Sequence, residues 1–175
     1  MTATYFDVIG TTTVQSGGAA SINFTSIPQT YTDLLLLCSL RGAASQTFSD
    51  NLIKFNSSVS DFSNKYIYAN GTNTFAGSNA YSGLGGFITG APASTNTINT
   101  FSNTRIYIPS YASSGDVKYY LVDGAADVNN SLAYLHMLIG LWNNSSAITS
   151  ISLVSDTATN YVQHSTATLY GIKNP

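Results

Sequence analysis

The sequence is poor in charged residues and contains no glutamate. Only 8% of the 175 residues are charged: six are Lys or Arg, and the eight acidic residues are all Asp. Glu and Lys normally cover the solvent side of helices, so their scarcity excludes an all-helical protein. With a net charge of −2 and no basic run, the chain also lacks the charge that drives binding to nucleic-acid phosphates, which excludes DNA or RNA as a main ligand.

Cysteine and long apolar runs are scarce too. The single cysteine, Cys38, excludes an intrachain disulfide, and its place after four leucines predicts a plain buried thiol. The longest unbroken apolar stretch, 34–38, is far shorter than the roughly 20 residues of a membrane-spanning helix. Residues 1–7 lack the basic and apolar regions of a signal peptide, so we expect a soluble protein made in the cytoplasm, with no membrane partner.

Patterns that carry catalysis or bind metals are missing as well. There is no Gly-x-Ser-x-Gly motif, and the Gly-rich segment 82–86 is not followed by the Lys of a phosphate-binding loop. His136 and His164 stand alone in the sequence, and we expect the first in the core and the second at the surface. No carboxylate pair indicates glycoside hydrolysis, and a His-Cys zinc cluster cannot be built. We therefore expect no enzymatic activity, no cofactor and no metal site.

Short polar residues and strand-forming residues dominate instead. The chain has 24 Ser, 21 Thr and 16 Asn, about a third of its length, which coat the surface with hydroxyls and amides. Tyr, Phe, Val and Ile are plentiful, and apolar runs recur between clusters of Gly, Ser and Asn at spacings typical of sandwiches. The sequence predicts one all-β domain over residues 1–175, a jelly-roll-like β-sandwich with long Ser/Asn/Gly-rich loops.

The expected strands follow from these runs. They lie at residues 4–9, 20–24, 33–39, 51–55, 65–68, 86–89, 99–108, 118–123, 133–141, 148–154 and 166–172. Segment 57–102 is predicted to form long loops with short strands, pinned by scattered aromatic rings. Segment 128–139 is also compatible with a short helix capped by Asn130, but Gly140 and apolar residues on both faces favour a strand.

The segment from Leu34 to Cys38 is apolar at every position. This pattern predicts a central strand buried on both faces, one against the core and one against a neighbouring subunit. We infer a homo-oligomer from it, with a trimer favoured. Arg41, just beyond this strand, is expected to bind loop carbonyls or a carboxylate such as Asp33 or Asp50.

Seven phrases spread along the chain carry a family resemblance. They are FTSIPQTYTDL at 24–34, SLR at 39–41, IKFN at 53–56, YIYANG at 66–71, IYIPSY at 106–111, GLWNNSSAITSI at 140–151 and LYGI at 169–172. Through them the chain resembles small β-rich structural proteins of tailed bacteriophages, abundant in phages of marine bacteria and cyanobacteria. The resemblance implies a non-enzymatic virion protein that occurs alone or as a module of longer fibre proteins.

Within that class, a capsid decoration or cement protein fits the sequence best. The chain has no coiled-coil or fibre shaft, and its surface is neutral and rich in hydroxyls. We therefore predict a protein located in the virion that binds the outside of the assembled capsid, with the major capsid protein as its partner. Because charges are few, an exposed apolar patch is expected to make the contact. Candidate contact residues are Thr2, Tyr5 and Phe6, with the 57–102 loops as the other candidate.

The alternative is a tail-fibre or head-fibre tip domain that binds host surface polysaccharide. Its candidate sugar-stacking residues are Trp142, Tyr66, Tyr68 and Tyr81. For Trp142 a role in the core is the competing interpretation, since a lone Trp at the end of an apolar strand usually fills a core. A sugar-binding tip would hold aromatic rings in solvent-facing grooves beside Asn and Asp, whereas a decoration protein would hide them in the core and at subunit contacts.

Overall fold

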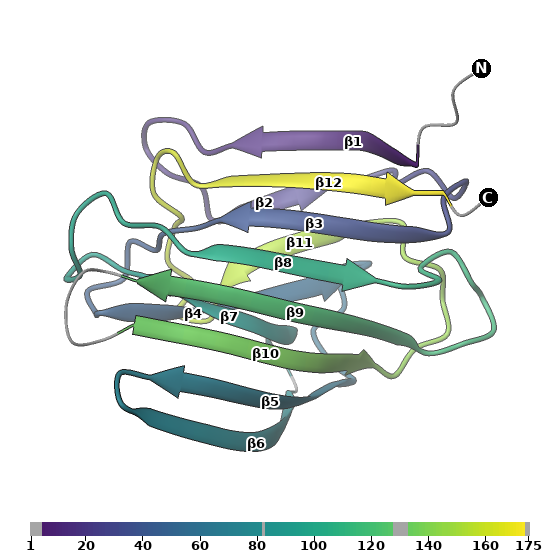
Figure 1. Ribbon diagram of the computed structural model, residues 1–175. Helices are drawn as coiled ribbons and strands as arrows, with labels where there is room; N and C mark the ends of the chain where they lie inside the picture. Colours follow the sequence, from purple (N-terminus) through teal and green to yellow (C-terminus); the bar gives the residue numbers. More distant parts are fainter. Residues whose placement is uncertain (1–4, 82, 128–132, 174–175) are drawn as a thin grey trace.

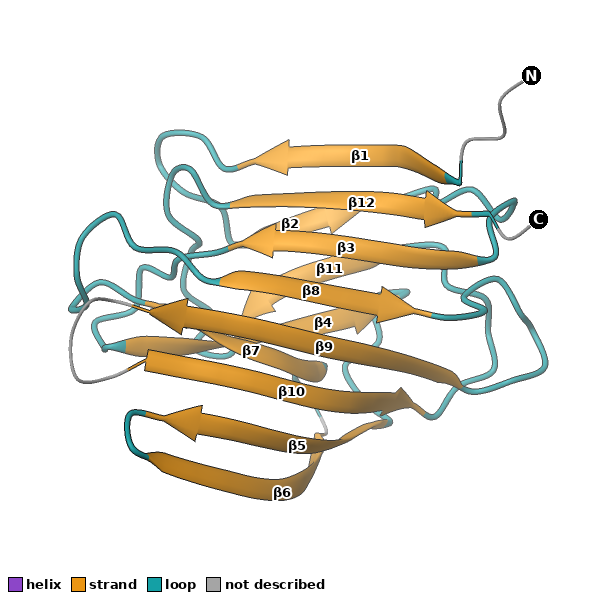
Figure 2. Cartoon of the chain, viewed as in Figure 1, coloured by secondary structure: helices purple, strands orange, loops and turns teal. Residues whose placement is uncertain are grey.

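The computed structural model describes residues 5–81, 83–127 and 133–173, which form twelve strands and no helix (Figure 2). The all-β prediction is confirmed. The strands are β1 (Phe6–Thr13), β2 (Ser21–Phe24), β3 (Asp33–Ser39), β4 (Phe48–Phe55), β5 (Phe62–Asn70), β6 (Asn73–Tyr81), β7 (Gly86–Pro92), β8 (Asn103–Ile108), β9 (Lys118–Asp127), β10 (Ala133–Trp142), β11 (Ile151–Ser155) and β12 (Thr166–Ile172).

The strands form two stacked sheets, which confirms the predicted β-sandwich. The large sheet has eight strands in the order β1-β12-β3-β8-β9-β10-β5-β6, and the small sheet has four in the order β2-β11-β4-β7. All neighbouring strands run antiparallel. The small sheet lies behind the upper and middle part of the large one, and the β5–β6 hairpin extends past it at the lower edge (Figure 1).

The strand order is consistent with the predicted jelly-roll winding, which stays a prediction. Strands β1, β12, β3 and β8 form one block of four within the large sheet, and β2, β11, β4 and β7 form the block of four that is the small sheet. The chain passes from one block to the other between β1 and β2, β2 and β3, β3 and β4, β7 and β8, and β11 and β12. Two hairpins, β5–β6 and β9–β10, are added to the first block and widen the large sheet.

The prediction of long loops with short strands over 57–102 is wrong for most of that segment. Strands β5, β6 and β7 occupy it, and β5 pairs with β6 along its whole length. Gly71 (φ 55°) lies in the two-residue turn between them, where a positive φ suits glycine. The many Ser, Asn and Gly residues suggested loops, but pairing within a sheet overrides such weak local preferences. The expected strand at 133–141 is confirmed as β10, while residues 128–132 lie outside the described residues.

The core between the sheets is centred on an aromatic cluster. The ring of Phe55 lies 5.8 Å from Phe62, 5.7 Å from Tyr120 and 5.7 Å from Trp142, measured between centroids. The ring of Tyr120 crosses directly over Gly140, where an added Cβ would come within 1.9 Å of it. Glycine is therefore required at position 140 for the large sheet to accept this ring.

Cys38 lies in this core, as the sequence predicted, with 4% of its surface exposed. Burial raises the pKa of its thiol well above the usual value, so the thiol stays protonated at neutral pH. We expect the native protein to react with a maleimide reagent only as fast as it unfolds, and the denatured protein to react at once. Rapid labelling of the native protein, followed by mass spectrometry, would contradict this placement.

Arg41 binds backbone carbonyls of the loop between β7 and β8, which confirms one of its two predicted roles. Its Nη1 donates hydrogen bonds to the carbonyls of Thr97 (2.7 Å) and Thr100 (3.0 Å), and its Nη2 donates to those of Ala93 (2.9 Å) and Asn96 (3.1 Å). The residue is 6% exposed. The carboxylate alternative is wrong for Asp33, which accepts hydrogen bonds from Tyr107 Oη and the Ser110 amide.

Candidate interaction face

Strand β3 shows how the large sheet divides its side chains between two faces. Leu34, Leu36 and Cys38 point into the core, whereas Leu35 is half-buried and Leu37 is 39% exposed on the opposite side. The predicted burial of one face against the core is confirmed. The opposite side, which we call the outer face, is turned away from the small sheet and is open in the single chain. Its burial against a neighbouring subunit stays a prediction.

The outer face carries apolar side chains across most of the width of the large sheet. One row follows the strand register from β10 to β12 and consists of Ile139, Leu121, Tyr107, Leu35 and Tyr170. Side chains directly opposite each other on one face of an antiparallel pair have Cβ atoms about 4.5–5.5 Å apart, so they form a continuous ridge.

The exposed apolar area of this face is large. Nine of its side chains are 39–62% exposed: Phe6, Val8, Leu37, Ile67, Tyr119, Leu121, Leu135, Met137 and Ile139. Taking about 200 Å² for each large residue, they present on the order of 900 Å² to solvent. Apolar patches beyond a few hundred Å² mark interaction sites, and one partner of a standard interface contributes about 800 Å².

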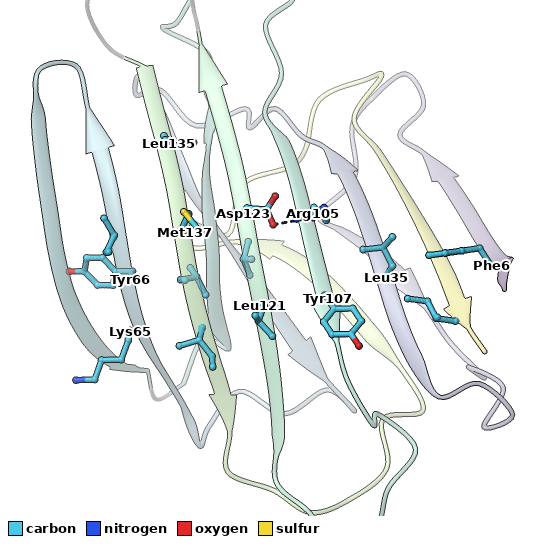
Figure 3. A pocket seen from close by; sticks show the side chains of 15 residues that line it. Phe6, Leu35, Lys65, Tyr66, Arg105, Tyr107, Leu121, Asp123, Leu135 and Met137 are labelled. Atoms are coloured by element: carbon cyan, nitrogen blue, oxygen red, sulfur yellow. Dashed lines mark hydrogen bonds and ion pairs between the residues drawn. The ribbon is translucent and has the colours of Figure 1, made fainter. Parts of the chain in front are cut away.

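Charge on the outer face is nearly balanced. Arg105 Nε donates to Asp123 Oδ1 at 3.1 Å, from β8 to β9, and both side chains remain about half in solvent. Figure 3 shows this pair between Met137 and Leu35, with Leu121 and Tyr107 next to it. Arg105 and Asp123 compensate each other, and Lys65 adds one positive charge to the groove lining, so the net charge of the face is small.

A shallow groove of about 970 Å³ runs along this face (Figure 3). Its lining includes Phe6 from β1 at one end and Met137 from β10 toward the other. Tyr5 and Phe6, two of the predicted contact residues, are both about half exposed, and Thr2 lies outside the described residues. The contact itself stays a prediction, but Phe6 is now placed on the same face as the apolar ridge.

The proposed sugar platform at Trp142 is wrong. Trp142 is 2% exposed, and its ring stacks on Phe62 at 6.2 Å with an interplanar angle of 18°. Side chains alternate along β10, so Trp142 points inward with Leu138. The competing interpretation, a Trp that fills the core, is confirmed.

The three candidate tyrosines have different outcomes. Tyr66 and Tyr68, on the inner side of β5, are partly buried and line a second, smaller cavity together with Asp50 and Asn79. Tyr81 ends β6, and its side chain lies outside the described residues. The structure thus brings two of the four sugar-stacking candidates together.

The histidines are placed as the sequence predicted. His136 is 5% exposed and His164 is exposed in the turn before β12. Within the described ranges, no group of three or more His, Cys, Asp or Glu side chains could hold a metal ion. The same part of the chain contains no helix that is long and apolar enough to cross a membrane.

Comparison of the chain with known protein families, with curated proteins and with solved structures finds no match.

Proposed function

We propose that this protein is a non-enzymatic structural protein of a bacteriophage virion, and that it decorates the outside of the assembled capsid as a homotrimer. The observation that carries the proposal is the open outer face of the large sheet, whose apolar area matches one side of a standard interface. A β-sandwich with such an open apolar face is suited to associate with other copies or with a partner. That the particle is a bacteriophage virion is inferred from the seven sequence phrases that resemble phage structural proteins.

The physical role follows from mass action. A protein that binds only the assembled shell stabilises that shell by its binding free energy, without any chemical step. Apolar burial is the main source of that free energy here, because the chain has only 8% charged residues with which to build ion-pair networks. The outer face buries against other copies, and Phe6 at its rim joins the contact with the capsid.

The alternative, a fibre tip that binds polysaccharide, keeps less support. Its aromatic platform was to include Trp142, which lies in the core. What favours it is the smaller cavity with Tyr66 and Tyr68, whose volume of about 210 Å³ is enough for one sugar unit at most.

Add-back to particles that lack this chain tests the proposal. Purified protein is mixed with such particles, which are then pelleted and analysed for bound protein against the major capsid protein. We expect saturable binding at a fixed ratio to the capsid protein, with a rise in the temperature at which the shell opens. Binding confined to isolated tails or fibres would refute decoration and favour the alternative.

A further inference from the structure

The smaller cavity lies on the opposite side of the large sheet from the outer face. It forms where strands β10, β5 and β6 extend beyond β7, the edge strand of the small sheet. Its volume is about 210 Å³, and its lining is aromatic and polar: Asp50, Tyr66, Tyr68, Asn79, Phe87, Tyr134 and His136. Figure 1 shows the β5–β6 hairpin projecting past β7 at this end of the sandwich.

The rings around the cavity hold one another in place. The rings of His136, Tyr134 and Tyr68 form a triangle, with centroids 5.5 Å apart for His136 and Tyr134 (interplanar angle 2°), 5.3 Å for His136 and Tyr68 (29°) and 6.1 Å for Tyr68 and Tyr134. Phe87 meets the His136 ring edge-on at 5.6 Å. The register explains the stack, because His136 lies directly opposite Tyr68, and Tyr134 is two residues along the same strand. Such a prearranged wall loses little conformational entropy when a ligand binds.

The side chains of His136 and Tyr134 are uncharged at neutral pH. Burial lowers the pKa of His136 to about 4, and its Nδ1 lies 3.3 Å from the Thr89 hydroxyl. Burial also raises the pKa of Tyr134, with a further contribution from the negative charge of Asp50. The charge of the cavity therefore depends on Asp50.

Asp50 brings an unpaired negative charge to the cavity. The ion pairs within the described residues are Arg105–Asp123 and Lys173–Asp7, and neither involves it. Asp50 is exposed to solvent, yet partial desolvation by its neighbours and the nearby charge of Asp156 raise the pKa of its carboxyl to about 6. Among the described residues, no Lys or Arg lines the cavity, so the local field is negative.

Gly90 leaves the space between the carboxylate and the imidazole open. It pairs with Asp50 across β4 and β7. A Cβ added at this position would lie 3.9 Å from Asp50 Oδ1 and 3.8 Å from His136 Cε1, both ordinary contact distances. Alanine would therefore fit the fold while taking up room between the two groups.

We propose that this cavity binds an alkylammonium group, held by the Asp50 carboxylate and by the aromatic rings of Tyr68, Tyr134 and His136. Aromatic rings attract organic cations through their quadrupoles, and a neighbouring carboxylate adds direct charge attraction. The volume of about 210 Å³ suits a headgroup such as trimethylammonium. The site does not involve the outer face. Failure of cation binding would therefore not refute the proposed function, and failure of the proposed function would not refute cation binding.

The test is an NMR titration of the full-length protein with two cations, choline and butylammonium, and with dimethylbutanol, the neutral carbon isostere of choline. We expect saturable shifts at Gly90 and His136 for at least one cation, with a Kd in about the millimolar range. Tighter binding of choline would indicate a quaternary ammonium ligand. Tighter binding of butylammonium would indicate a primary amine such as a lysine side chain. The neutral isostere is expected to bind at least about tenfold more weakly.

Two variants locate the binding. Asp50→Asn keeps the shape and removes the charge, and we expect it to weaken cation binding at least about tenfold. Gly90→Ala is expected to weaken it as well, with the spectrum of a folded protein retained. Asp116→Asn, a carboxylate that does not line the cavity, is the matched control and should bind as the wild type does.

The pH dependence gives a second readout. Choline keeps its charge at every pH, so its affinity reports the protein groups alone. The groups facing Asp50 are Asp156 after β11, Tyr134 and His136 on β10, and Tyr66 and Tyr68 on β5. We expect the Kd to rise as the pH falls below about 6, where Asp50 becomes protonated.

Equal binding of the isostere, unchanged binding by Asp50→Asn, tighter binding of a monosaccharide or no saturable cation binding would each overturn the proposal.

Discussion

Replacing Arg41 by methionine is expected to lower the free energy of unfolding by about 3–5 kcal/mol. The variant removes the guanidinium that donates to four loop carbonyls at residues 93–100. These acceptors lie in a buried or partly buried site, and each unsatisfied buried acceptor costs about 1–3 kcal/mol. Urea titration followed by the fluorescence of Trp142, at one fixed protein concentration, measures the loss.

Arg105→Met is the matched control for this variant. It removes the same side chain from an exposed ion pair with Asp123, for which we expect a loss below about 1 kcal/mol. Arg41→Lys should recover only part of the stability, because a single ammonium cannot reproduce the planar fork of donors. Equal effects of Arg41→Met and Arg105→Met would show that the loop does not depend on Arg41.

Replacing Met137 by glutamate is expected to abolish self-association. Met137 is 62% exposed in the middle of the outer face, so the single chain tolerates the change. In an oligomer that buries this face, the new carboxylate would lose its water without gaining a partner. We expect association to weaken by at least about 100-fold, equivalent to about 3 kcal/mol. Sedimentation velocity over a range of concentrations measures it.

Ile98→Glu is the control for the outer-face variant. Ile98 is 77% exposed, lies in the loop between β7 and β8, and does not line the groove of the outer face. The Ile98→Glu variant also replaces an exposed apolar residue by a glutamate, but at a different surface. We expect oligomers for the wild type and for Ile98→Glu. A wild-type protein that sediments as a monomer at all concentrations would contradict burial of the outer face between copies.

Strand alternation accounts for what could be predicted of the fold. The segment predicted as a strand at 20–24 forms β2, and its alternating polar and apolar residues place Ile22 and Phe24 in the core. Strand β6 was missed because Asn73–Tyr81 consists mainly of small and polar residues, and it is held in the sheet by pairing with β5. Asn70-Gly71 is a turn signal, but the residues after it lack the run of apolar or β-branched residues that would have indicated a strand.

The candidate sites were harder to predict, for a related reason. The apolar run at 34–38 correctly pointed to a second apolar face, because every other residue of β3 lies on the outer face. The rest of that face comes from Leu121, Met137 and Ile139 in other strands, and only the register brings them together. The cavity around Asp50 and His136 joins side chains from opposite sheets, which no spacing in the sequence reveals.

The copy number of this chain in purified virions tests the central proposal most directly. Quantitative mass spectrometry would compare peptides of this protein with those of the major capsid protein. A decoration protein is expected in numbers close to stoichiometric with the shell, or in a simple fraction of them. A copy number in the range of tail or fibre components would contradict capsid decoration.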